Sequence, residues 1–455
     1  MVFGFASESG GSFVRTAQQS AVGLVVTVTA ALTLVTGCSS DDSPRADDGR
    51  PVREEASASA PKAYDPPLRF GEGGVRLAVE DDDRTEVALR GTTAYVLTET
   101  GLAAYDIRGG GRQWTSRDHG MSTGVEERAR VWETTAPTAT KQGGRTLVLF
   151  ALQKYQQGEG TAKDVSTSHL RAVDAADGKE VWTATLPTPK GMGVGDDSSP
   201  TVVGVEGDTA VVTLRTAPED GTDGVRSAVT YGVNLTTRHV DWQADGFGAR
   251  MLSGGVVVGA QLPEGAEIDS ERWFADEGGI ALTGRSVKDG AVSWKDPRDL
   301  FGLKIETVGA GLFSARINLE FKENRPDYEL LDSAAGRRPA GMTADSAAAF
   351  SFAGRSCSYD ERSVIVCGVD GELAALDART HKVLWTLDED DPAREVPSLY
   401  TAWHGVVYGG VPGRGGVLLD ATTGKDRATF DAGRPAVVNE YGGLDMDLTV
   451  YPATG

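Results

Sequence analysis

Cysteine and histidine are scarce in this chain. The three cysteines are Cys38, Cys357 and Cys367, so no two of them are adjacent. The five histidines are scattered and show no metal-ligand spacing. The body of the chain also has no long segment of apolar residues at helical spacing. These absences argue against a helical fold and against a metal centre.

Basic residues are outnumbered as well. The chain has 45 Lys and Arg against 66 Asp and Glu, which gives a formal net charge of −21. Such an excess repels nucleic acid and anionic lipid headgroups over most of the surface. We therefore expect no nucleic-acid partner. Acidic runs at 80–83 and 388–391 could bind Ca²⁺, but such runs are usually solvated loops, so no metal site is predicted.

One apolar run lies near the N-terminus. Residues 21–37 are uncharged, follow Arg15 and end at Cys38. The local sequence LVTGC, which ends at Cys38, resembles a bacterial lipobox. The resemblance implies cleavage before Cys38, a lipid on Cys38 and a place on the extracytoplasmic face of the cell membrane. An uncleaved anchor and a plain signal peptide are the alternatives, although the run is short for a lasting span.

The composition divides the chain into three segments. Residues 1–37 form the expected lipoprotein signal peptide. Residues 38–67 are rich in Ser, Ala, Asp and Pro and nearly free of large apolar groups, so we expect a disordered tether. Residues 68–455 contain no further apolar run of spanning length and are expected to form the folded body.

The body has an all-β signature. Glycine is abundant, with 58 residues, and short runs rich in Val, Thr, Leu and Tyr are separated by Gly-containing turns. The stretch LRAVDAADGKEVW at 170–182 recurs in altered copies along the chain. A short polar anchor residue precedes a tryptophan by eight positions at Asp106 and Trp114, Asp174 and Trp182, Asn234 and Trp242, Ser286 and Trp294, and Asp377 and Trp385. Ala340 and Ala428 stand in place of the tryptophan in two further copies.

The repeat has a physical interpretation. The anchor side chain can accept hydrogen bonds from the next two backbone amides, and a glycine four positions later supplies a positive φ in most copies. The chain then reverses into a strand on which the tryptophan can bury a large area. Because repeated units of this size cannot bury their faces alone, we expect each tryptophan to fill the seam between neighbouring units.

A second Gly-containing turn lies upstream in most units, so each unit should form a four-stranded blade and the whole a β-propeller. Seven anchors are clear, and LTVYPATG at 448–455 aligns with VLLDATTG at 417–424 as the start of an eighth unit. The chain ends where the last strand of that unit should begin. Residues 68–79 could supply this strand and close the ring. Eight blades are therefore predicted, with seven as the alternative.

The repeat resembles that of the PQQ-like β-propellers. The matches are closest at Ala172-Val173-Asp174 with Gly178-Lys179 and Trp182, and at Ala375-Leu376-Asp377 with Lys382 and Trp385. The resemblance covers roughly residues 68–455. It implies a propeller shared by quinoprotein dehydrogenases and by a propeller lipoprotein of the outer-membrane β-barrel assembly machinery, and the lipobox resembles the second.

Three functions compete on this basis. A quinone-dependent sugar or alcohol dehydrogenase of the family would be expected to have adjacent cysteines beneath the cofactor, which this chain lacks. A propeller could also bind a glycan or small ligand. We favour a non-enzymatic, membrane-anchored platform for protein partners, without a cofactor, a metal or catalytic residues, and expect it to be monomeric.

Two further features complete the expectations. Cys357 and Cys367 flank a hairpin turn near residues 360–362, so a disulfide is predicted, with two free thiols as the alternative. Trp273 and Phe274 lie among charged residues in an apparent insertion. They are candidate contacts for a partner. The alternative is that this segment folds back and covers the edge of a blade.

Overall fold

A computed structural model describes residues 61–455, except 80–84, 119, 124–135, 163–164, 191, 194–199, 219–226, 264–272, 275–277, 318–327, 344–345, 347–349, 351–355, 370, 391–392 and 432. The chain divides into two compact units, Met1–Ser59 and Ala60–Gly455. The first unit, with the predicted signal peptide, most of the tether and Cys38, lies outside the described residues. In the part that is described, no helix is long and apolar enough to cross a membrane.

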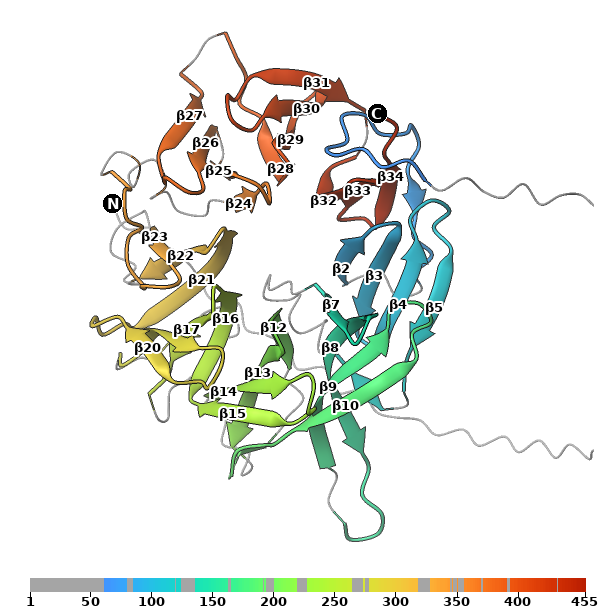
Figure 1. The fold of residues 1–455 in the computed structure, drawn as a ribbon, viewed down its shortest axis with the longest axis vertical. Helices are drawn as coiled ribbons and strands as arrows, with labels where there is room; N and C mark the ends of the chain where they lie inside the picture. The colour runs from blue at the N-terminus through green and yellow to red at the C-terminus, as the bar shows by residue number, and fades with distance from the viewer. Residues whose placement is uncertain are drawn as a thin grey trace, which may run out of the picture. The chain divides into compact units, whose positions relative to one another are not determined.

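The described residues form eight antiparallel sheets, which follow one another around a ring (Figure 1). We call the sheets blades and letter their strands A to D from the centre of the ring outward. Blade 1 contains β2 (Glu86–Arg90), β3 (Thr93–Thr98), β4 (Gly101–Asp106) and β5 (Arg112–Ser116). Blade 2 contains β7 (Thr138–Gln142), β8 (Arg145–Gln156), β9 (Val165–Asp174) and β10 (Glu180–Leu186), and β6 (Met121–Ser122) also pairs with β8.

Blade 3 contains β12 (Thr201–Glu206), β13 (Thr209–Pro218), β14 (Ser227–Asn234) and β15 (Val240–Asp245), with β11 (Met192–Gly193) also on β13. Blade 4 contains β16 (Phe247–Ser253), β17 (Val256–Gln261), β19 (Ala281–Ser286) and β20 (Val292–Lys295). Blade 5 contains β21 (Gly302–Gly309), β22 (Leu312–Ile317) and β23 (Tyr328–Asp332), and β18 (Trp273–Phe274) pairs with β21.

Blade 6 contains β24 (Ser356–Tyr359), β25 (Val364–Val369), β26 (Glu372–Asp377) and β27 (Val383–Asp388). Blade 7 contains β28 (Ser398–Trp403), β29 (Val406–Val411), β30 (Gly415–Asp420) and β31 (Asp426–Phe430). Blade 8 contains β32 (Pro435–Asn439), β33 (Gly442–Asp445), β34 (Thr449–Pro452) and, as its outermost strand, β1 (Val75–Arg76). The chain is thus an eight-bladed, all-β propeller, as the sequence predicts, and the seven-blade alternative is wrong.

The N-terminal strand closes the ring. Val75 lies opposite Val450 and Arg76 opposite Thr449 in an antiparallel pair. Leu77 N–H donates to Leu448 O at 2.9 Å, and Gly71 N–H donates to Pro452 O at 2.8 Å. Segments from both ends of the chain therefore form one sheet, which places the described start of the chain beside its end.

The A–B and C–D turns lie at the same end of the ring, as the antiparallel order requires. In blade 2, for example, Ala175 N–H in the C–D turn donates to Thr146 O, beside the A–B turn, at 3.0 Å. The same link joins Leu235 to Asp208 in blade 3 and Val287 to Gly255 in blade 4. We call this end, made of all the A–B and C–D turns, the turn face.

Apolar clusters fill the seams between blades. Blades 2 and 3 share one cluster, which includes Trp182, Leu170 and Tyr231. The seam between blades 7 and 8 has Ala428 where the repeat expects a tryptophan, and Leu68 and Phe70 pack there instead. The Phe70 ring lies 5.6 Å from that of Phe430, centroid to centroid. The N-terminal segment thus supplies the aromatic group that blade 7 lacks.

Blade 5 departs from the four-strand expectation. After the turn that follows β23, only Arg337 bridges back to Asp332 among the described residues. Pro339 comes two residues later and has no amide hydrogen to continue a ladder. The fourth strand of this sheet is β18, which pairs on the opposite, inner side and takes no letter, so β21, β22 and β23 are strands A, B and C of blade 5. Phe350 and Met342 pack into the seam with blade 6, where Ala340 stands in the tryptophan position.

A buried carboxylate links blades 4 and 5. Asp296 follows β20, and its side chain is 4% exposed. Burial raises its pKa, but hydrogen bonds from the side chain and backbone N–H of Arg298 outweigh burial and hold the pKa of Asp296 below its usual value. Arg298 also pairs with Glu329 of β23 at 2.7 Å.

Asp296→Asn should lower the free energy of unfolding at pH 7 by about 1–2 kcal/mol, a value reduced because Arg298 remains partly exposed. A carboxyl group whose pKa is depressed by folding stabilises above its unfolded pKa, near 3.9, and loses that effect as the pH falls through its folded pKa. The difference between variant and parent should therefore shrink as the pH falls from the unfolded pKa through the lower folded pKa. Urea unfolding of variant and parent at several pH values measures this difference. A difference that does not change with pH would contradict the lowered pKa of Asp296.

Candidate functional site

Four of the five predicted seam tryptophans donate their indole N–H to the neighbouring blade. Each acceptor is the carbonyl that directly follows the anchor of the next blade: Trp114 to Ala175 at 3.0 Å, and Trp242 to Val287, Trp294 to Ser333 and Trp385 to Ala421 at 2.8 Å each. Each of these tryptophans therefore ties its own outermost strand to the C–D turn of its neighbour.

The glycine of the anchor turn has a second role at these seams. Gly178 has a φ of 70°, and a Cβ added there would lie 2.3 Å from the Trp114 ring. The turn of blade 6 instead has His381 with a φ of 57°, and it faces Ala340, not a tryptophan. At Gly178 the turn needs glycine both for its backbone and for the close approach of the indole ring.

Trp182 reaches its neighbour through an intermediate side chain. Its Nε1 donates to Gln142 Oε1 at 3.4 Å, and Gln142 Nε2 donates to Leu235 O of blade 3. Trp182 is 4% exposed. The amide of Gln142 thus relays the contact that the other tryptophans make directly.

The predicted disulfide is present. Cys357 on β24 lies directly opposite Cys367 on β25, and their sulfur atoms are 2.02 Å apart. Cys367 is buried in the seam between blades 5 and 6. The bond links the A and B strands of blade 6 within one hairpin.

The candidate contact residues Trp273 and Phe274 form β18. Trp273 pairs with Leu303 and Phe274 with Gly302, so this short strand covers the inner edge of blade 5. The backbone therefore adopts the edge-covering arrangement that the sequence left as an alternative. The side chains of both residues lie outside what the structure describes.

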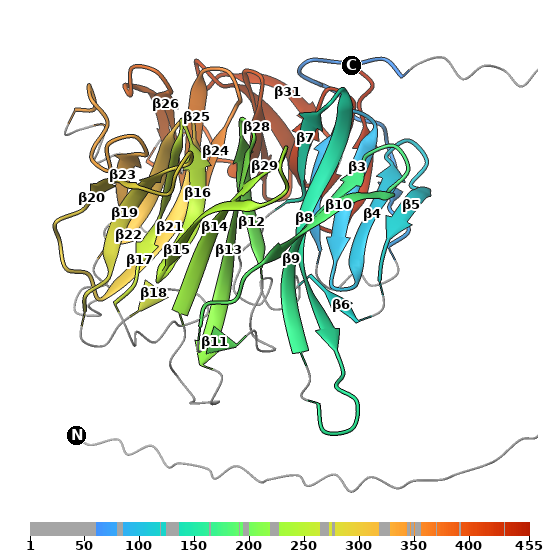
Figure 2. The same ribbon diagram turned by 60° about the horizontal axis from the view of Figure 1, so that its bottom comes forward.

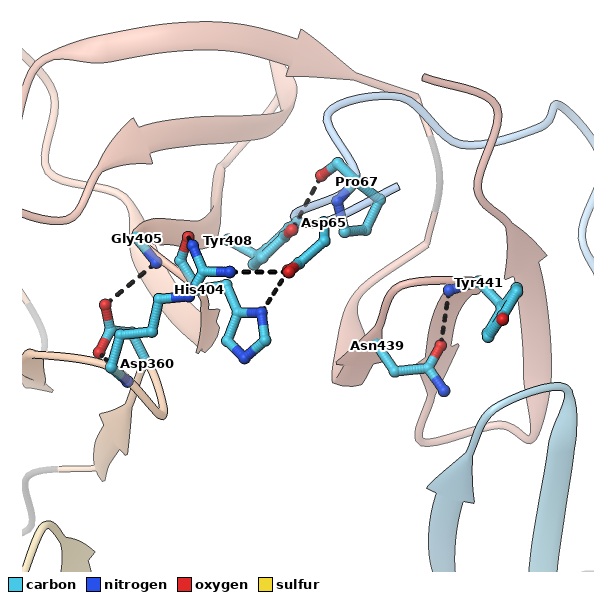
Figure 3. A network of polar contacts seen from close by, with 9 residues as sticks. Asp65, Pro67, Asp360, His404, Gly405, Tyr408, Asn439 and Tyr441 are labelled. Atoms are coloured by element: carbon cyan, nitrogen blue, oxygen red, sulfur yellow. Dashed lines mark hydrogen bonds and ion pairs between the residues drawn. The ribbon is translucent and has the colours of Figure 1, made fainter. Parts of the chain in front are cut away.

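The segment before β1 contacts the turn face, although the sequence assigns residues 61–67 to the tether. We call residues 61–79 the N-terminal arm. The Asp65 carboxylate pairs with Arg362 at 2.7 Å and with the imidazole of His404 (Figure 3). Tyr64 N–H donates to Glu440 O at 2.7 Å. The arm thus reaches the A–B turns of blades 6, 7 and 8.

A buried carboxylate holds the two basic groups in place. Asp360 is fully buried, and its Oδ1 accepts from the backbone N–H groups of Arg362, Ser363 and Val364 at 2.7–2.9 Å. Its Oδ2 accepts from Gly405 N–H at 3.0 Å, which joins the turns of blades 6 and 7 (Figure 3). Arg362 and His404 are therefore positioned before the arm contributes Asp65.

The hydroxyl of Tyr408 fixes the next residues of the arm. It donates to Pro67 O at 2.8 Å. Burial raises the pKa of the Tyr408 hydroxyl far above its usual value, so this group stays protonated as a donor. The Tyr408 ring also packs against Phe70, with 6.0 Å between centroids.

Asp65→Ala should loosen the arm without unfolding the ring, because it removes a partly exposed ion pair with Arg362 and a hydrogen bond with the imidazole of His404, while Phe70 and β1 remain. We expect cleavage by trypsin after Lys62 and Arg69 to become about threefold to tenfold faster, as the loss of about 1 kcal/mol of local stability predicts. Lys288→Ala is the matched control, since it removes an exposed cation from the C–D turn of blade 4, away from the arm. Equal cleavage rates for parent and Asp65→Ala would show that the pairs do not hold the arm.

The histidines have separate environments. His169 lies between the hydroxyls of Thr167, 2.8 Å from its Nε2, and Thr185, 3.3 Å from its Nδ1. Burial, together with the nearby cations Arg171 and Lys154, lowers the pKa of His169, which favours the neutral ring. His381 and His404 occupy turns, and His119 lies outside the described residues. Among the residues that the structure describes, no group of three or more His, Cys, Asp or Glu is placed to hold a metal ion.

Blade 2 has a hairpin that extends beyond the ring. Its strands β8 and β9 have 12 and 10 residues, and their far ends project at the end opposite the turn face (Figure 2). Tyr155 is 50% exposed and Val165 is 51% exposed near the tip of this hairpin. An aromatic and an aliphatic side chain on a projecting hairpin provide apolar area that a protein partner can bury.

A small cavity of about 210 Å³ lies in blade 7, beside the connection from blade 6. Arg394 and Arg414 line it, and each pairs with a carboxylate: Arg394 with Asp426, and Arg414 with Glu395 at 2.8 Å. Because both guanidinium groups have acidic partners, the cavity shows no preference for an ionic ligand.

The fold and these contacts define an eight-bladed β-propeller tied together by its own N-terminal arm. No protein-family model and no curated protein matches the chain. Among solved structures, it is similar to Saccharomyces cerevisiae Sqt1, with a TM-score of 0.39 and 10% identity over 85% of this chain and 98% of that one. The computationally designed Ika8 protein gives a TM-score of 0.31 and 13% identity over 78% of this chain and 98% of that one. Likenesses at this level carry no argument about function.

Proposed function

We propose that this protein is a membrane-anchored extracytoplasmic lipoprotein of the PQQ-like repeat family, whose propeller binds protein partners in envelope assembly or sensing. The observation that carries the platform role is the projecting β8–β9 hairpin, with Tyr155 and Val165 exposed. The lipobox-like sequence before Cys38 supports the anchor. Beneath the hairpin, seams closed by apolar clusters give a rigid support that loses little entropy on binding.

The anchor has a direct test. Cys38→Ala should release the protein from the membrane fraction or leave its precursor uncut, because the lipid is the proposed attachment. Ser39→Ala, one residue away, is the matched control and should fractionate like the parent. Processing and membrane association of Cys38→Ala that equal those of the parent would refute lipid anchoring at this residue.

The platform role is tested by site-specific crosslinking in cells. A photoreactive phenylalanine in place of Tyr155 should give discrete protein adducts, because the hairpin tip is the proposed contact. The same group in place of exposed His239, on the turn face, is the control. Absence of adducts from position 155, or the same adducts from both positions, would count against a partner site on the hairpin.

A further inference from the structure

The cavity of blade 7 has an aliphatic floor. Its volume is about 210 Å³, and its apolar lining comes from Pro397, Val411, Val417 and Leu419. Val417 is only partly buried in the middle of β30, although the next residues, Leu418 and Leu419, are fully buried. Because pockets for drug-sized ligands are larger, about 300–1,000 Å³, this cavity suits a small molecule with one aliphatic side chain.

Two ion pairs lie at this cavity, and both involve the connection from blade 6 to blade 7. Arg394 of the connection pairs with Asp426 on β31. Glu395, the next residue, pairs at 2.8 Å with Arg414 in the turn between β29 and β30. All four side chains line the cavity. Their charges balance, so the cavity favours neither a net cation nor a net anion. A ligand that carries one charge of each sign finds a partner for both.

These ion pairs can open for such a ligand at little cost. The side chains of Glu395, Arg414 and Asp426 are more than half exposed, and exposed ion pairs contribute little to stability. Arg394 differs, because its side chain is only 27% exposed. Its Nη2 also donates to Gly424 O at 2.7 Å, which holds the guanidinium in place. Arg394 is therefore the better positioned and less screened of the two cations for a ligand carboxylate.

We infer that the blade 7 cavity binds a zwitterionic α-amino acid with an aliphatic side chain, such as leucine. The ligand carboxylate takes the place of Asp426 at Arg394, and the ligand ammonium group pairs with the released carboxylate of Asp426. One carbon separates the two charged groups of an α-amino acid, so a ligand inserted into this ion pair can bind both partners at once. Its side chain then lies on Val417 and Leu419. This site does not depend on the anchor at Cys38 or on the β8–β9 hairpin.

Ligand-observed NMR titration of the chain that begins at Ser39 tests the inference with three probes. These are L-leucine, 4-methylpentanoate, which lacks the ammonium group, and 3-methylbutylamine, which lacks the carboxylate. Each analogue loses one charge-assisted contact, so leucine should bind about tenfold more tightly than either. Equal affinity for all three probes, tighter binding of an analogue, or the absence of saturable binding of leucine would overturn the inference.

Two substitutions test the position of the ligand. Arg394→Met should weaken the binding of leucine about tenfold without weakening that of 3-methylbutylamine, because it removes only the partner of the carboxylate. Asp426→Asn should weaken the binding of leucine similarly without weakening that of 4-methylpentanoate. Arg427→Met and Asp388→Asn are the matched controls, since each removes an exposed charge of the same sign outside the cavity. Unchanged affinity in both cavity variants, or equal losses in the controls, would contradict this placement.

Val417→Phe supplies a test that leaves all four charges in place. The larger ring occupies the floor on which the ligand side chain lies, and phenylalanine is well suited to a β-strand. The affinity for leucine should fall at least tenfold, while circular dichroism should show the fold of the parent. Val165→Phe, on the projecting hairpin, is the control and should bind leucine like the parent. A folded Val417→Phe variant that binds leucine as tightly as the parent would overturn the inference. If this variant does not fold, Arg394→Met and Asp426→Asn decide.

Discussion

A chain that begins at Glu80 should be insoluble, or less stable than the parent by more than about 5 kcal/mol. It loses β1, which leaves β34 as an open edge with unpaired backbone groups. It also loses Phe70 from the seam between blades 7 and 8, and Val75, which packs against Gly110 of blade 1. This one deletion therefore opens the sheet of blade 8 and the seams that blade 8 forms with blades 7 and 1.

The matched control removes residues 39–60 only, from a chain expressed without its signal. It keeps the whole N-terminal arm, so its melting temperature and solubility should equal those of the parent. A chain beginning at Glu80 that is soluble, monomeric and as stable as the parent would mean that the arm does not close the ring.

Trp182→Ala should lower the free energy of unfolding by about 3–5 kcal/mol, the range for emptying a large buried aromatic site. The indole is almost fully buried in the seam between blades 2 and 3. Its removal also leaves the side chain of Gln142 without the N–H that it accepts. Trp182→Phe should cost less, because much of the apolar contact remains.

Tyr155→Ala is the control for this substitution. Tyr155 is 50% exposed on the projecting hairpin, and exposed positions usually change stability by less than about 0.5 kcal/mol. Denaturant unfolding of the variants, followed by circular dichroism, gives the comparison. Similar losses for Trp182→Ala and Tyr155→Ala would refute the assignment of Trp182 to a structural seam.

The repeated part of the architecture could be predicted from the sequence because each unit encodes its own turn. The anchor at Asp377 accepts from the amides of Arg379 and Thr380, which the spacing predicts, and the hairpin that joins Cys357 to Cys367 is equally local. Ring closure was also predictable, since the last unit ends one strand short and an unpaired segment lies at the other end of the body.

Contacts that break the repeat could not be predicted in the same way. Gln142 relays the contact of Trp182 from a strand 40 residues upstream, and no periodic signal marks it. The pairing of Asp65 with His404 joins residues 339 positions apart, within a stretch whose composition predicts disorder. The sequence gives only two weak indications of this contact. The two prolines after Asp65 restrict the backbone of the arm. Blade 7 also lacks a seam tryptophan, so another segment has to fill that seam.

The projecting hairpin was only partly visible in the sequence. The anchors Asp106, Asp174 and Asn234 are 68 and 60 residues apart, against 43 residues from Asp377 to Asp420. These long intervals place extra residues in blades 1 to 3, but spacing cannot tell a long hairpin from a loop. The structure shows that part of this length extends β8 and β9, while β6 and β11 add short pairings to β8 and β13. Backbone hydrogen bonding, not composition, decides between those outcomes.

Ring closure by the N-terminal arm is the central claim, and a cysteine pair tests it most directly. Val75 and Val450 are Cα partners in the closing sheet. In the chain without residues 1–38, Val75→Cys with Val450→Cys should form a disulfide nearly completely under mild oxidation, seen as a reduction-sensitive peptide link in mass spectrometry. Val75→Cys with Val437→Cys, on an inner strand of the same blade, should not. Failure of the first pair to link, or equal linking of both pairs, would contradict the closed eight-bladed ring.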